Sequence, residues 1–241
     1  NWLCAAEFAD SVGADIINSS LGYTTFDVAE QDHTYKDLDG RTTPISKAAV
    51  MASRKGIIVC SSAGNYGNNS WYFIGAPADA DSILSVGAVY ADETPTSFSS
   101  FGPSADNRVK PNVSAQGGNT AVYSTGDYVT TSNGTSFSSP IIAGMTACLW
   151  QAHPDKTNME VINAIIQSAH LYNMPNDQLG YGIPNYTLAN ALLSIEDETN
   201  PFFSVYPNPL KNYSQLYAIV PNAENITYGL YNLEGKLLDY Q

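Results

Sequence analysis

Short apolar runs alternate with stretches of helical periodicity in the first half of this 241-residue chain. The runs at residues 15–19, 57–61 and 82–89 predict buried strands. Apolar residues at helical spacing predict helices over 2–12 and 45–55, and a glycine follows each of these two stretches. Continuous apolar strands that alternate with helices form parallel sheets covered on both faces. The sequence therefore predicts an α/β fold, with any functional site at the carboxyl ends of the strands.

The segment from Asn133 to Pro140 places a serine at the start of a buried helix. It reads Asn-Gly-Thr-Ser-Phe-Ser-Ser-Pro and leads directly into the apolar stretch 141–150. The N–H groups of a first helical turn favour negative charge beside them, so Ser136 can act there as a nucleophile. A serine or threonine before an apolar run is also an ordinary N-cap residue, which is the alternative for this segment taken alone.

Two earlier blocks favour the nucleophile. Residues 15–22 read Asp-Ile-Ile-Asn-Ser-Ser-Leu-Gly, and residues 57–65 read Ile-Ile-Val-Cys-Ser-Ser-Ala-Gly-Asn. In this order, and with Gly-Thr-Ser at 134–136, the blocks resemble those of the subtilisin-like serine proteases, the subtilases. Residues 97–103 and 110–113 are similar to the family's segment between the last two blocks.

The resemblance covers about residues 1–195 and implies a secreted serine endopeptidase that acts on peptides or proteins. Ser136 would be its nucleophile, and Asn65 would be the side-chain donor of the oxyanion hole, together with the Ser136 N–H. A turn asparagine is the alternative for Asn65, but its position just after an apolar strand favours the oxyanion-hole role. The remaining implied residues contact the substrate: Ser20, Leu21 and Gly22 would pair with its backbone, and Ser62, Ala63 and Gly64 would line the pocket for the residue before the cut. Thr135 would also bind substrate.

The aspartate and the histidine of the subtilase triad have no counterpart in the sequence. Both precede the Ser-Leu-Gly block in that family, whereas the residues before this block here include Asp10 and Asp15 but no histidine. His33, His153 and His170 are poor substitutes, and His153 stands at the far end of a helix ~25 Å long. We therefore expect a fragment that begins after both partners and is inactive alone.

Two other function classes remain in view. A relative that has lost catalysis would be a surface-sorted binding protein on a protease-derived fold. A serine hydrolase of α/β-hydrolase order would use Asp177 and His170, which follow the serine. The second class is disfavoured because the Gly-x-Ser-x-Gly elbow is absent around Ser136.

Composition excludes several partners. The formal net charge is −13, which argues against binding to nucleic acid or to an anionic membrane surface. No apolar run reaches the ~18 residues of a membrane span. The apolar surroundings of Cys4, Cys60 and Cys148 predict three buried free thiols. No cofactor is required, but the alternate carboxylates Asp37 and Asp39 could hold structural calcium, with a solvated turn as the favoured alternative.

The composition changes near residue 195. Residues 196–201 form an acidic linker, and residues 202–241 predict a small antiparallel β module, a partial β-sandwich. Residues 205–209 and 230–236 resemble the C-terminal sorting domain of type IX secretion in Bacteroidetes, which implies secretion machinery as a partner and a secreted or cell-surface location. A generic β-sandwich appendage is the alternative. Before the linker, a capping box at Thr157 opens another helix, and a last helix is predicted near 186–193.

Overall fold

The computed structural model describes residues 1–194, 204–206, 217–219, 229–231 and 237–240. The chain divides into two compact units, Asn1–Ser194 and Ile195–Gln241.

The first unit is built on a parallel sheet of four strands, in the order β1-β2-β3-β4. The strands are β1 (Ile16–Ser19), β2 (Ile58–Ser62), β3 (Leu84–Val89) and β4 (Val113–Gln116). Every residue of β2 and β3 is buried, as continuous apolar runs require. The first three strands confirm the sequence prediction, whereas β4 was not predicted because its four residues Val-Ser-Ala-Gln carry little apolar signal.

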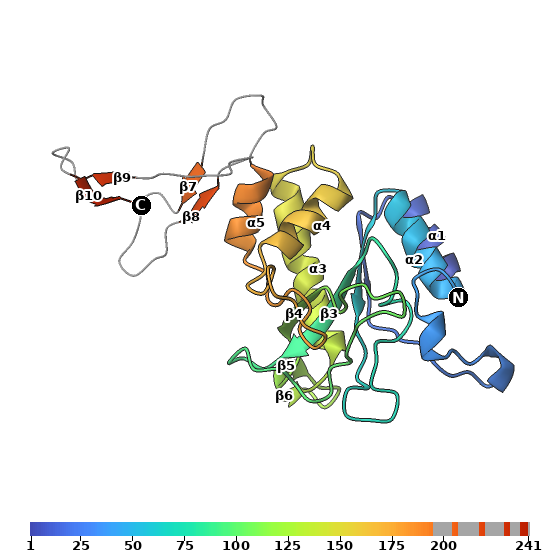
Figure 1. The fold of residues 1–241 in the computed structure, drawn as a ribbon. Coiled ribbons are helices and arrows are strands. Elements are labelled where there is room, and N and C mark those ends of the chain that lie inside the picture. The colour runs from blue at the N-terminus through green and yellow to red at the C-terminus, as the bar shows by residue number, and fades with distance from the viewer. Residues whose placement is uncertain (195–203, 207–216, 220–228, 232–236, 241) are drawn as a thin grey trace. The chain divides into compact units, whose positions relative to one another are not determined.

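Helices cover both faces of this sheet, as predicted (Figure 1). One face packs on α1 (Trp2–Ser11) and α2 (Pro44–Arg54), and the other on α3 (Thr135–Ala152), α4 (Asn158–Gln167) and α5 (Tyr186–Leu193). Successive residues of β2 alternate between the two cores because side chains of a strand point to opposite faces. Two short 3₁₀ helices, Ala29–Gln31 and Tyr35–Asp37, lie in the connection between β1 and α2.

Side-chain caps fix where the helices begin. Thr43 Oγ1 accepts a hydrogen bond from Ser46 N at the start of α2. At α4 the predicted capping box is present, since Thr157 N and Oγ1 donate to the Glu160 carboxylate and Glu160 N donates to Thr157 Oγ1. Asn185 Oδ1 accepts from Leu188 N and opens α5.

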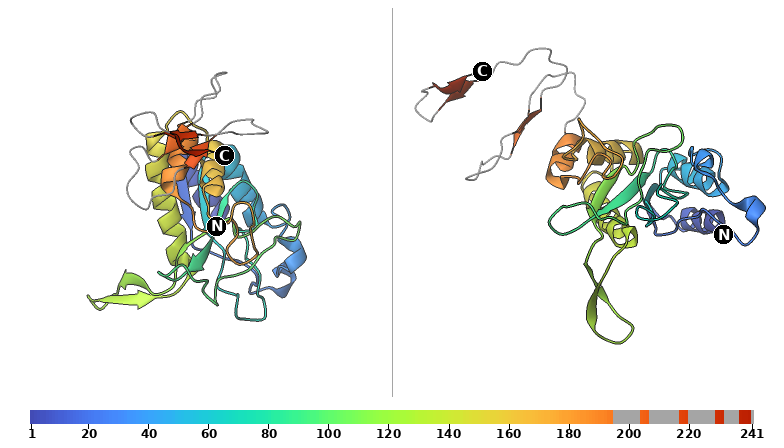
Figure 2. Two further views of the ribbon diagram at one scale, coloured as in Figure 1. Left: turned by 60° about the vertical axis from the view of Figure 1, so that its left-hand side comes forward. Right: turned by 60° about the horizontal axis from the view of Figure 1, so that its bottom comes forward.

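An antiparallel hairpin joins the sheet to α3. It consists of β5 (Thr120–Tyr123) and β6 (Val129–Ser132), with Thr120 opposite Ser132 and Tyr123 opposite Val129. Both views in Figure 2 show this ribbon projecting from the body of the unit.

The second unit contains two short antiparallel ribbons among its described residues. β7 (Ser204–Tyr206) pairs with β8 (Tyr217–Ile219), and β9 (Gly229–Tyr231) pairs with β10 (Leu237–Tyr240). A sandwich needs two sheets packed face to face, and two separate two-stranded ribbons do not make one. The expected β-sandwich is therefore not formed by the described residues. The predicted linker at 196–201 lies outside them.

The expectation of three buried thiols is wrong for two of them. Cys60 is fully buried in β2, and burial raises the pKa of its thiol to about 12. Cys4 on α1 and Cys148 on α3 are exposed. The residues of α3 are apolar on most sides of the helix. The sequence therefore does not indicate which side packs on other elements and which side faces solvent. Among the described residues, no helix has the length and apolar content needed to cross a bilayer.

Candidate active site

Ser136 lies in the first turn of α3, two residues after the buried Gly134. Its side chain is half-buried, and its N–H has no intrahelical acceptor because the first four N–H groups of a helix lack one. Gly134 N donates to Gly117 O over 2.8 Å, which joins the start of the helix to the end of β4. The nucleophile candidate therefore stands at an open helix N-terminus.

A proline one turn later gives the Ser136 carbonyl a distant partner. Pro140 lies inside α3 and has no N–H, so it cannot donate to the carbonyl of the residue four positions earlier. Ser20 supplies the donor instead, because its Oγ lies 3.2 Å from Ser136 O. Ser139 Oγ also donates to Asn18 Oδ1 over 2.8 Å. These two bonds fasten the first turns of α3 to the carboxyl end of β1 and the segment that follows it.

Asn65 is held against the same helix start. Its Oδ1 accepts from Thr135 N over 2.9 Å and from Thr135 Oγ1 over 3.0 Å. A backbone N–H can only donate, so the amide must present its oxygen to Thr135. This orientation leaves Asn65 Nδ2 as a donor near Gly134, 3.5 Å from where a Cβ on that glycine would lie. Thr135 is buried, and its Oγ1 accepts from Gly64 N over 3.2 Å, so it links the end of β2 to α3.

The implied substrate-contacting residues differ in exposure. Ser20, Leu21 and Gly22 are all exposed just after β1. Ser62 and Ala63 are buried at the end of β2. The backbone of Ala63 is already used, since its N–H donates to Val86 O and its carbonyl accepts from Gly75 N.

Gly64 takes a conformation that favours glycine. Its φ is +112°, and a Cβ there would lie 2.8 Å from Ser100 Oγ. Ser100 was not singled out in the sequence, although it lies in the block at 97–103. Its N–H donates to Gly64 O, and its Oγ accepts from Tyr66 N, so it fixes the strand end on which Asn65 stands. Hydrogen bonds thus bring Ser20, Gly64, Asn65, Thr135 and Ser136 together, whereas Leu21, Gly22, Ser62 and Ala63 enter no such bond to them.

None of the three histidines forms a hydrogen bond with Ser136 in the described part of the chain. His153 caps the far end of α3 and has Nε2 2.9 Å from Asn190 Oδ1. His170 Nδ1 accepts from Ile183 N. His33 packs edge-on against Phe26.

The carboxylates considered as calcium ligands serve their own turns. Asp37 Oδ2 accepts from Thr34 N and Oγ1, and Asp39 accepts from the N–H groups of Arg41 and Thr42. The hydrogen bonds from Thr34 lower the pKa of Asp37. For Asp39 the largest single influence is burial, which raises the pKa, but the hydrogen bonds from Arg41 and Thr42 together outweigh it and lower the pKa. Residues 1–194 and the described strands beyond them contain no group of three or more His, Cys, Asp or Glu side chains that could hold a metal ion. Calcium also binds backbone and side-chain amide carbonyl oxygens, so structural calcium stays a prediction.

Sequence comparison gives the family. A model of the subtilase family matches residues 4–182, and the chain therefore belongs to the subtilases. Subtilisin DY from Bacillus licheniformis is 34% identical over 166 residues, which are 68% of this chain and 52% of that protein. Serine protease AprX from Bacillus subtilis is 33% identical over 168 residues, which are 61% of this chain and 36% of that protein. The chain thus spans about half or less of the length of these relatives.

Solved structures share the fold. The prenylagaramide maturation protease PagA superposes with a TM-score of 0.62 at 23% identity, over 80% of this chain and 66% of that chain. The PatG macrocyclase in complex with peptide gives a TM-score of 0.62 at 23% identity, over 80% of this chain and 56% of that chain. At this identity the likeness establishes the subtilisin-like architecture alone.

Proposed function

We propose that this chain carries the nucleophile half of a serine endopeptidase, which hydrolyses peptide bonds through an acyl-enzyme. The observation that carries the proposal is the arrangement at the start of α3: Ser136 lies in the first turn, and Thr135, the residue before it, holds the Asn65 amide by two hydrogen bonds. The membership of the chain in the subtilase family supports the same activity.

The chemistry assigned to these residues is acyl transfer. Ser136 Oγ attacks the scissile carbonyl, whose oxygen becomes negatively charged in the tetrahedral intermediate. Asn65 Nδ2 and the Ser136 N–H donate hydrogen bonds to that oxygen, and the positive end of the α3 dipole adds to its stabilisation. The hydroxyl proton has to pass to a base during the attack. The described residues supply none, so we assign the base and its carboxylate partner to residues outside them.

Substrate binding is assigned to the two segments that flank the nucleophile. The exposed residues Ser20, Leu21 and Gly22 can pair with an extended peptide, because backbone donors and acceptors at a strand end recognise any sequence. Ser62, Ala63 and Gly64 have small side chains and would leave room for the side chain before the cut.

Location and sorting stay proposals. Several of the curated relatives in Bacillus are subtilisins, and we place this protein outside the cell. Recognition by secretion machinery would involve residues 205–209 and 230–236, of which 207–209 and 232–236 lie outside the described residues.

The first experiment is to sequence the coding DNA upstream of Asn1. We expect an open reading frame that encodes an aspartate motif and then His-Gly-Thr. The protein encoded by the whole frame should hydrolyse casein. Ser136→Ala should abolish the hydrolysis, whereas the matched control Ser194→Ala, at the end of α5, should keep it.

The same assay separates the alternatives. The 241-residue chain alone should not turn over casein, because without a base its serine is a weak nucleophile. A start codon or signal peptide immediately before Asn1, with no hydrolysis by the encoded protein, would contradict the endopeptidase and leave a binding protein on a protease fold.

A further inference from the structure

The hairpin formed by β5 and β6 has most of its hydrophobic side chains on the face open to solvent. That face carries Ala121, Tyr123, Val129 and Thr131, and the exposed fractions of Tyr123 and Val129 are 71% and 72%. The opposite face is half-buried and carries three hydroxyl side chains beside Val122. A ribbon that packs on its own protein has its apolar residues inside and its polar residues outside. The inverted arrangement indicates a surface that binds something else.

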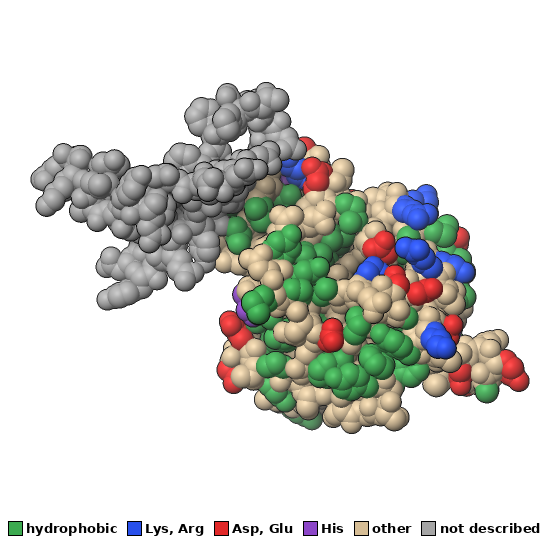
Figure 3. All heavy atoms as spheres, in the orientation of Figure 1, with side chains coloured by type: hydrophobic (Ala, Val, Ile, Leu, Met, Phe, Trp, Pro, Cys, Tyr) green, Lys and Arg blue, Asp and Glu red, His purple; other side chains and the backbone are tan. Residues whose placement is uncertain are grey.

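The outer edges of the ribbon are available for pairing. Among the described residues, β5 and β6 form a two-stranded sheet and pair only with each other, so each has a row of unpaired N–H and C=O groups on its outer side. Such an edge accepts an extended polypeptide by strand addition. The hairpin from 119 to 133 has one charged side chain, Asp127. In Figure 3, Lys and Arg side chains gather toward α1 and α2, and the lower face is mostly hydrophobic or uncharged.

The base of the hairpin is continuous with the candidate active site. Asn119 N donates to Asn133 Oδ1 over 2.7 Å, which closes the base, and Gly134 follows directly. Ser136 is two residues further. Because a strand rises ~3.3 Å per residue, the pair Tyr123 and Val129, four residues from Asn119 and Asn133, lies ~13 Å beyond the base. An extended polypeptide that passes Ser136 could therefore continue along the ribbon.

We propose that the β5–β6 ribbon binds the polypeptide substrate on the leaving-group side of the cut. The segments Ser20–Gly22 and Ser62–Gly64 are assigned to the substrate residues before the cut. The ribbon belongs to a different segment of the chain, which connects to Ser136 through Asn133 and Gly134, and it is therefore assigned to the residues after the cut. The occupant is an extended, weakly charged segment with hydrophobic side chains. This inference rests on the proposed function, because it names the substrate of the same site.

Binding to an unfolded protein tests the inference without requiring turnover. Fluorescently labelled β-casein is titrated with the 241-residue chain carrying Ser136→Ala, and the Kd is read from anisotropy. The hairpin variant carries Tyr123→Ser and Val129→Thr in addition. These two substitutions remove the hydrophobic side chains, introduce no charge, and at position 129 keep a β-branched residue that favours a strand. We expect binding to weaken at least tenfold. The matched control, Phe8→Ser on α1, removes an aromatic that is 68% exposed and should change the Kd less than twofold.

Each remaining outcome has a definite meaning. Circular dichroism should show the fold unchanged, since both substituted side chains are exposed. An equal Kd for the hairpin variant and its parent would overturn the inference, whatever Ser136 does in the hydrolysis assay. A dimer in sedimentation velocity that the hairpin substitutions dissociate would also overturn it, because the ribbon would then bind a second copy. Hairpin-dependent casein binding without hydrolysis by the whole reading frame would instead contradict the proposed function.

Discussion

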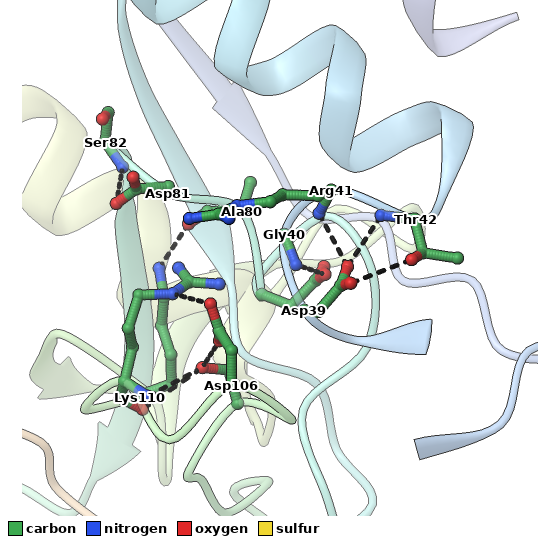
Figure 4. A network of polar contacts seen from close by, with 12 residues as sticks. Asp39, Gly40, Arg41, Thr42, Ala80, Asp81, Ser82, Asp106 and Lys110 are labelled. Carbon is green, nitrogen blue, oxygen red and sulfur yellow. Dashed lines mark hydrogen bonds and ion pairs between the residues drawn. The ribbon is translucent and has the colours of Figure 1, made fainter. Parts of the chain in front are cut away.

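The stability of this protein should rise with pH above neutrality because of one buried lysine. Lys110 is 2% exposed, and its Nζ donates to Ala80 O over 2.7 Å and to Asn112 Oδ1 over 3.0 Å (Figure 4). Burial, and after it the positive charge of Arg108, lower the pKa of this ammonium group from 10.5 to about 7, against the opposing effect of Asp79. The folded chain therefore releases this proton at lower pH than the unfolded chain does.

The sign and size follow from proton linkage. Between pH 7 and 10.5 the unfolded chain holds more protons at this lysine, so the free energy of unfolding increases with pH. For a folded pKa of about 7, the contribution from Lys110 grows by about 2 kcal/mol between pH 7 and pH 9. Below pH 7 the cost of burying the charge is fully present.

Urea unfolding at pH 7, 8 and 9 measures this contribution. Lys110→Met keeps the length of the side chain and removes the titrating group, so the increase should be missing from its pH profile. Other titrations, such as that of the Cys60 thiol, occur in both proteins and cancel in the difference. Parallel pH profiles for the parent and the variant would show that Lys110 keeps an ordinary pKa when buried.

Three further predictions concern single residues. In the protein encoded by the whole reading frame, Asn65→Ala should lower kcat for casein about 10²–10³-fold, the magnitude known for the oxyanion-hole asparagine of subtilisin itself, a member of this family; an unchanged kcat would remove Asn65 from the mechanism. Thr157→Ala should lower the free energy of unfolding by ~1 kcal/mol, read from the urea midpoint, because it deletes the α4 cap, and no shift would mean that the box is not stabilising. Gly180→Ala should destabilise the protein strongly, since φ is +63° and a Cβ would overlap the Pro111 carbonyl oxygen. Gly144 lies within α3, and no atom stands within 4 Å of an added Cβ, so Gly144→Ala should raise the free energy of unfolding by up to ~1 kcal/mol. Equal melting temperatures for these two variants would contradict the geometry.

Local patterns predicted the elements that hold the site. The strand before Asn65 and the helix after Gly134 were both visible as apolar runs bounded by glycine, because burial and chain reversal leave a signature within a few residues. The capping box at Thr157 was visible for the same reason. β4 was missed because its burial comes from neighbouring elements rather than from its own residues.

The orientation of the site residues could not be predicted in this way. The partner of the Ser136 carbonyl is Ser20, 116 residues away, and the amide of Asn65 is turned by Thr135, 70 residues away. Pro140 revealed that the carbonyl lacks a helical donor, but nothing near it in the sequence names the replacement. Exposure of Cys148 likewise depends on which elements pack beside α3.

The order of strands, helices and the candidate nucleophile follows from the sequence, since periodicity, caps and glycine stops act over one or two turns of chain. The parallel register of β1 and β2 then brings their carboxyl ends to one edge of the sheet, where α3 begins. Contacts between residues so far apart depend on the packing of whole elements. For that reason the fixed amide of Asn65, the exposed thiols and the outward hydrophobic face of the β5–β6 ribbon became apparent only once the chain was folded.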